Sequence, residues 1–173
     1  SVIRSALDLP SAERMTDAYL AAGASGLTIL GIMGEAPKLD AEESIAFVRT
    51  VLNRVAGRVP VVVGVSAPGL ASMRTLARAS VDVGAAGVMI APPSGLRGDD
   101  AVVAYIEQAS DAIGDIPYVL QDYPQATGTF MSADMICRMA ADPKLVMLKA
   151  EDWPGLDKIG AIRRMEREGA MKR

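Results

Sequence analysis

The chain has 173 residues, a net charge of −3 and a hydrophobic fraction of 50%. This length suits one sizeable core, and we expect a single domain over residues 1–173. Without a basic block or an apolar run near ~18 residues, neither a nucleic-acid partner nor a membrane span is expected. The absence of histidine excludes histidine triads and histidine metal sites. A lone cysteine, Cys137, fits a reducing, cytoplasmic compartment.

The hydrophobic pattern predicts helices and strands in alternation. Helices are expected at 11–22, 40–56, 70–83, 99–113, 132–141 and 155–168, and strands at 26–30, 59–65, 87–91, 117–121 and from about 145 to Lys149. Ser11 is expected to cap the first helix, which Gly23 ends, and Asp40 with Glu43 is expected to form a capping box at the start of the second. The spacing of about 30 residues indicates successive βα units and a buried parallel sheet. An open doubly wound sheet and a (β/α)₈ TIM barrel both fit, but no Gly-x-Gly-x-x-Gly follows the first strand. The repetition favours a barrel, and since eight units need ~250 residues, we expect a partial one.

Lys149 follows a short apolar run and precedes a turn, so it is expected at the carboxyl end of a buried strand. Folds of this class place their chemistry at that end. Partial desolvation there favours the neutral amine, the form that attacks a carbonyl carbon. The alternative is a strand-end lysine that extends to water. We expect Glu151 and Asp152 to cap the following helix rather than to take part in catalysis.

A glycine-containing turn follows the first strand. Its residues are Gly31, Ile32, Met33, Gly34 and Glu35. Two glycines let backbone N–H groups approach a ligand closely, and such a turn can bind a carboxylate. The alternative is a tight βα turn without a ligand.

Gln121 and Tyr123 lie at the end of the fourth predicted strand. If the chain stays extended, both side chains share one face with Val119 and reach into a cavity beside Lys149. The alternative is a tyrosine that packs under a loop.

Together and in this order, these stretches resemble the dihydrodipicolinate synthase and N-acetylneuraminate lyase family. The family pattern is Gly-Thr-Thr-Gly-Glu after the second strand, Tyr-Asn-x-Pro after the fifth and a lysine at the end of the sixth. The resemblance covers about residues 12 to 168, so the chain corresponds to the second to sixth strands of the family barrel. Lys149 matches the lysine that forms a Schiff base with a 2-oxo acid, and Gly31, Gly34 and Glu35 match the glycines and glutamate.

The chain departs from the family at the residues that carry hydroxyl groups. Ile32 and Met33 replace the hydroxyl residues that bind the carboxylate and relay protons, so only backbone N–H groups are left for the carboxylate. Gln121 replaces the family tyrosine when the motif is aligned through Pro124, and Tyr123 is a candidate substitute for it.

Other departures indicate a branch of the family. Residues 93–94 replace a tyrosine pair of the dihydrodipicolinate synthases, and Ala126 replaces the arginine for their second carboxylate, which argues against lysine biosynthesis. The run Gln121, Asp122, x, Pro124 resembles the fifth-strand motif of 2-keto-3-deoxyarabonate dehydratases, in the sugar-acid branch.

The resemblance implies a Schiff-base-forming lyase, an aldolase or a dehydratase, that acts on pyruvate or a 2-keto-3-deoxy sugar acid. Lys149, Tyr123 and Gln121 are the catalytic candidates, and residues 31–35 are the candidates for substrate binding. The covalent imine needs no cofactor or metal, and a homo-oligomer is expected by analogy. The alternative is a non-catalytic barrel segment with a role in assembly or binding, because three strands of the family barrel have no counterpart.

Overall fold

The computed structural model describes residues 7–67 and 69–171. Within these ranges the strands are β1 (Leu27–Ile29), β2 (Val61–Gly64), β3 (Gly87–Ile90), β4 (Tyr118–Asp122) and β5 (Leu145–Ala150). The helices are α1 (Leu9–Ala21), α2 (Ala41–Val55), α3 (Leu70–Asp82), α4 (Asp99–Ile113), α5 (Pro124–Thr127), α6 (Ala133–Met139) and α7 (Leu156–Arg167), with 3₁₀ turns η1 (Ile32–Gly34) and η2 (Ala36–Lys38). The alternation of the larger helices and strands confirms the predicted one. The predicted turn at residues 31–35 contains η1, whereas α5 and η2 were not expected.

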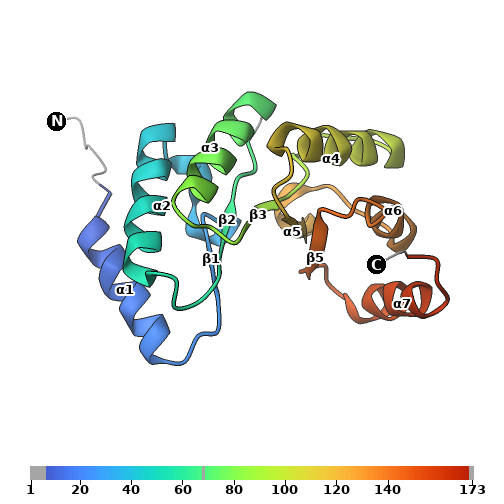
Figure 1. Cartoon of the computed structure of the whole chain (residues 1–173). Helices are drawn as coiled ribbons and strands as arrows, with labels where there is room; N and C mark the ends of the chain where they lie inside the picture. The colour runs from blue at the N-terminus through green and yellow to red at the C-terminus, as the bar shows by residue number, and fades with distance from the viewer. Residues whose placement is uncertain (1–6, 68, 172–173) are drawn as a thin grey trace.

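The strands form one parallel sheet in the order β1-β2-β3-β4-β5. A doubly wound sheet reverses its strand order at a switch point, whereas a barrel keeps the order of the chain. Figure 1 shows the helices around the outside of the sheet, from α1 at the left over α3 and α4 to α7 at the right. The fold is therefore a partial (β/α)₈ barrel.

Polar side chains fix where the helices begin. Asp40 and Glu43 form the predicted capping box of α2, because each side chain accepts the backbone N–H of the other residue, at 2.8 and 3.1 Å. The prediction that Ser11 caps α1 is wrong. Asp8 caps it instead and accepts the Ser11 N–H at 3.0 Å, and Pro10 occupies the first turn, where its missing N–H costs nothing.

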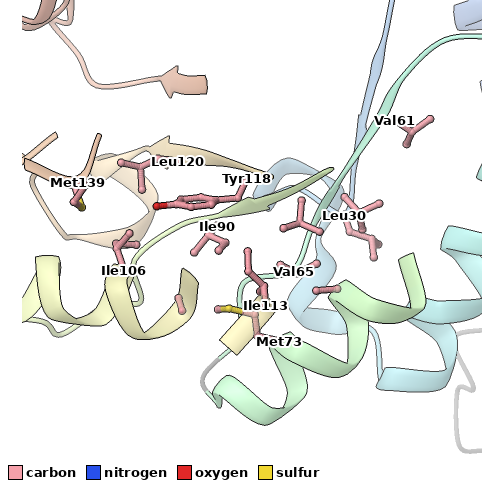
Figure 2. Packing of buried hydrophobic residues seen from close by; sticks show 14 of the residues in the cluster. Leu30, Val61, Val65, Met73, Ile90, Ile106, Ile113, Tyr118, Leu120 and Met139 are labelled. Atoms are coloured by element: carbon pink, nitrogen blue, oxygen red, sulfur yellow. The ribbon is translucent and has the colours of Figure 1, made fainter. Parts of the chain in front are cut away.

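The hydrophobic core lies between the sheet and the helices outside it. Figure 2 shows Ile90 and Leu120 among the side chains that meet Met73 of α3 and Ile106 of α4 there. Each of these four side chains is at most 1% exposed. This core supports the middle strands and therefore the strand ends that carry the candidate site.

The prediction that β5 is buried is wrong. Val146 and Met147 are 54% and 57% exposed. The reason is that β5 is the last strand in the sheet order, so within the described ranges no strand pairs with its outer edge, and α7 packs against α6. Apolar residues at such a position predict a covering element, which the described chain does not supply.

In the described part of the chain, no helix combines the length and the apolar character that a membrane crossing requires.

Candidate active site

Lys149 lies near the carboxyl end of β5, as predicted, and is in register with Gln121 on β4. Its side chain is 38% exposed, so it is not enclosed by apolar walls as the sequence suggested. The Lys149 Nζ lies 2.7 Å from Oε1 of Glu151. The nearest polar partner of the candidate nucleophile is therefore a carboxylate on its own strand end.

Glu151 connects the two strands at this point. Its Oε2 accepts a hydrogen bond from Nε2 of Gln121 at 2.7 Å, and its backbone N–H donates to the carbonyl oxygen of Asp122 at 2.8 Å. Gln121 is only 2% exposed, so its amide holds the carboxylate firmly. The prediction that Glu151 caps a helix is wrong, because α7 begins after Gly155 and has no side-chain cap.

Glu151 is the site residue that the sequence analysis did not identify. A signal was present: Glu151 is two residues after Lys149, and side chains at this spacing lie on one face of an extended chain. The helix-capping interpretation concealed it, since an acidic residue close to a helix start is a common cap. The ladder hydrogen bond to Asp122 keeps the chain extended through Glu151 and so prevents that role.

The predicted substrate-binding turn and Lys149 line the same cavity, which has a volume of about 880 Å³. Gly31, Ile32, Met33, Gly34 and Glu35 all line this cavity, together with Lys149 and residues of α1, β1 and α2. The fold thus brings together two stretches that are more than a hundred residues apart. The side chain of Glu35 forms an ion pair with Lys38, which also lines the cavity.

The turn owes its shape to a close backbone contact. Leu30, which precedes it, has a φ of +52°, in the left-handed region. The Leu30 carbonyl oxygen lies 2.1 Å from the position that a Cβ atom on Gly64 would occupy. Only glycine fits there, so β2 permits the sharp turn at the end of β1.

Tyr123 does not share a strand face with Gln121, because β4 ends at Asp122 and Pro124 begins α5. The Tyr123 carbonyl oxygen accepts hydrogen bonds from the backbone and hydroxyl of Thr127. Within residues 7–67 and 69–171 no hydrogen bond of the Tyr123 hydroxyl is found. Its catalytic role stays a prediction.

A second cluster of charges involves Asp122 and Asp152, the residues that follow Gln121 and Glu151 in the sequence. Nζ of Lys158, on α7, is 2.9 Å from Oδ2 of Asp122 and 2.5 Å from Oδ2 of Asp152. Asp122 is completely buried, and its Oδ1 has no hydrogen-bond partner in the described part of the chain. One lysine thus ties the end of β4 to the segment that follows Glu151.

The pKa values in this cluster depend on burial and on the fact that two carboxylates share one lysine. Burial raises the pKa of Asp122, and the hydrogen bond from Lys158 only partly opposes this. The pKa of Asp152, which is more exposed, is lowered chiefly by its hydrogen bond with Lys158. Burial acts against the charge of Lys158, but its hydrogen bonds to both carboxylates outweigh burial and raise the pKa of Lys158. Asp122 is therefore the carboxylate that takes up a proton more readily.

In the described ranges no group of three or more cysteine, aspartate or glutamate side chains is arranged to hold a metal ion. The groups present at the site are an amine, a carboxylate and an amide at one strand end, and a turn with backbone N–H groups that lines the same cavity as the amine.

A run of parallel βα units with a lysine at the carboxyl end of its last strand defines a partial barrel with a candidate amine nucleophile. The chain belongs to the dihydrodipicolinate synthetase family, whose pattern matches residues 4–164. It is 36% identical over 157 residues to 4-hydroxy-tetrahydrodipicolinate synthase 1 of Streptomyces coelicolor. This match covers 89% of the present chain and 51% of the Streptomyces protein. It is also 36% identical over 153 residues to L-2-keto-3-deoxyarabonate dehydratase of Azospirillum brasilense, with 86% and 49% covered.

Among solved structures, dihydrodipicolinate synthase from Rhodopseudomonas palustris matches with a TM-score of 0.91 and 50% identity, over 95% of this chain and 55% of that one. The chain thus spans about half the length of the relatives it matches.

Proposed function

We propose that the protein is a Schiff-base-forming lyase that dehydrates a 2-keto-3-deoxy sugar acid, with Lys149 as nucleophile and Glu151 as the proton-transfer group. The observation that carries this proposal is the contact of the Glu151 carboxylate with both Lys149 and Gln121. The similarity to a 2-keto-3-deoxyarabonate dehydratase supports the choice of substrate class.

In the first step the Glu151 carboxylate accepts the ammonium proton of Lys149, and the free amine attacks the C2 carbonyl of the 2-oxo acid. Loss of water gives a protonated imine. The substrate carboxylate binds to backbone N–H groups of the turn at residues 31–35, across the cavity that Lys149 also lines.

The imine acidifies the C3 protons, and a carboxylate next to the imine nitrogen is placed to remove one of them. The resulting enamine expels the C4 hydroxyl, which leaves as water after Glu151 returns the proton. A water molecule then hydrolyses the unsaturated imine, which releases the 2-oxo acid product and restores the Lys149 amine. Gln121 donates to Glu151 throughout and fixes its orientation. An aldol cleavage would instead need a base at the C4 hydroxyl, and the hydroxyl relay of the family is replaced here by Ile32, Met33 and Gln121.

The test is borohydride trapping with pyruvate and a set of 2-keto-3-deoxy sugar acids, read by peptide mass spectrometry. We expect a reduced adduct on the Lys149 peptide and none in Lys149→Ala. No adduct on a chain that is folded by circular dichroism would refute imine chemistry and favour the non-catalytic alternative.

A second measurement isolates Glu151. Exchange of the pyruvate methyl protons in D₂O, followed by NMR, reports removal of the C3 proton. We expect Glu151→Gln to lower this exchange by about 100-fold or more, since proton transfer by a placed group contributes 10²–10⁴-fold. The borohydride adduct should still form in this variant at long reaction times. Unchanged exchange would exclude Glu151 as the base.

A further inference from the structure

We infer that Lys158 is a positioning residue: by binding Asp122 and Asp152 together, it anchors the segment after β5 so that the Glu151 carboxylate stays between Lys149 and Gln121. This inference rests on the proposed function. Within the described residues, the side chains of Lys158, Asp122 and Asp152 form no ion pair with Lys149, so their effect on the reaction passes through the segment that carries Glu151.

The segment that carries Glu151 has few other attachments. The Glu151 N–H donates to the Asp122 carbonyl oxygen at 2.8 Å, and this is the last rung of the β4–β5 ladder. Beyond it, Trp153 is 83% exposed and its N–H donates back to Oδ1 of Asp152 at 2.8 Å. Without a connection to the body of the protein, such a segment would move freely in water.

Lys158 supplies that connection. Its side chain is 15% exposed, and it reaches from the first turns of α7 to a carboxylate at 0% exposure on β4 and to one at 14% exposure on the segment. Gln125 adds two long contacts from its Nε2, at 3.3 Å to Oδ1 of Asp152 and at 3.4 Å to the carbonyl oxygen of Trp153. Lys158 therefore joins three elements through one ammonium group.

Asp122 is the fixed point of the arrangement. Its side chain binds Lys158, whereas its backbone carbonyl oxygen receives the Glu151 N–H. Its neighbour Gln121, which points to the opposite face, holds the Glu151 carboxylate. Release of Lys158 leaves a buried carboxylate without a partner and leaves Asp152 unattached, so the position of Glu151 is no longer defined from both sides.

The experiment compares Lys158→Met with Lys158→Arg, which can keep both contacts. Lys144→Met is the matched control, because Lys144 lies at the opposite end of β5 and donates to the carbonyl oxygens of Ser110 and Gly114 at 2.8 and 3.1 Å. Amide hydrogen exchange is followed at Glu151 and Trp153. We expect exchange to accelerate about tenfold or more in Lys158→Met and to stay near wild type in the other two variants.

The catalytic consequence is measured by a double-mutant cycle with Glu151→Gln on the rate of pyruvate imine trapping. We expect Lys158→Met to lower the rate constant about tenfold in the wild-type background, since misplacement by about 1 Å costs up to 10²-fold, and little in the Glu151→Gln background. If Lys158→Met only unfolded part of the protein, it would reduce the fraction of chains that can be labelled, and the trapping rate would change by the same factor in the wild-type and Glu151→Gln backgrounds.

The outcomes separate the inference from the proposed function. If the wild-type chain forms no adduct at Lys149, the proposed function fails, and the exchange data alone decide whether Lys158 anchors the segment. If the adduct forms but Lys158→Met leaves the Glu151 amide protected, or lowers trapping equally in both backgrounds, the positioning role is refuted while the proposed function stands.

Discussion

Lys158→Met also makes a strong prediction about stability, because it keeps the length of the side chain and removes its charge. Asp122 is completely buried and Lys158 is 15% exposed on its side chain. Removal of one partner from a buried ion pair costs about 3–5 kcal/mol, because the other charge is left uncompensated. We expect a loss near the lower limit, about 3 kcal/mol in the free energy of unfolding at pH 8, since Asp152 can still turn toward water.

This loss should depend on pH with a definite sign. Burial raises the pKa of Asp122 even with Lys158 present, and the variant lacks the cation that opposes this shift. As pH falls through the raised pKa of Asp122, the folded variant takes up a proton at this residue while the unfolded chain, with a pKa of about 3.9, stays ionised. The folded state then binds more protons, so the free energy of unfolding increases by at most about 1.4 kcal/mol per pH unit.

Urea unfolding followed by circular dichroism at pH 5, 6, 7 and 8 measures this dependence. The control is the double variant Asp122→Asn with Lys158→Met, which removes both charges and should be less destabilised at pH 8 and nearly independent of pH. An equal loss for Lys158→Met at pH 5 and pH 8 would show that the cost is lost packing and would refute the electrostatic argument.

Two further predictions concern the elements that shape the site. Gly64→Ala should cost about 3 kcal/mol of unfolding free energy, because its Cβ would meet the Leu30 carbonyl oxygen at 2.1 Å and the backbone has to move. Gly34→Ala is the control in the same urea assay, with no atom within 4 Å of its Cβ, and a loss as large as that of Gly64→Ala would contradict this explanation. Asp40→Ala should cost about 1 kcal/mol through loss of the α2 cap, and an unchanged urea midpoint would contradict it.

The fold could be predicted from the sequence because each signal is local. Short apolar runs, the Asp40 cap and the positive-φ glycine at Gly23 mark the boundaries of elements without reference to the rest of the chain. The burial of β5 could not be predicted in this way. Val146 and Met147 are as apolar as residues of the inner strands, and their exposure is decided by which elements lie next to β5.

The candidate site could be predicted only where its residues carry a recognisable spacing. Lys149 and the Gly31–Glu35 turn were singled out in this way and line one cavity, whereas their roles in binding and catalysis stay predictions. The pairing of Lys158 with Asp122 was not predicted, because they are 36 residues apart and nothing in either stretch indicates the other. Asp122 was noted only as part of the motif that ends at Pro124, and only the packing of α7 near the end of β4 brings the two side chains together as an ion pair.

The alternation of side chains at the strand ends explains how one edge of the sheet carries both clusters. Gln121 and Glu151 contact each other beside Lys149. Asp122 and Asp152, which follow Gln121 and Glu151 directly in the sequence, both contact Lys158. A shift of β4 against β5 by one residue would turn the side chains of one strand to the opposite face of the sheet. Asp122 would then lie on the face where Gln121 now holds Glu151. The anchor and the reactive group thus depend on the same register, and the ion pair on the outer face stabilises the register that the inner face requires.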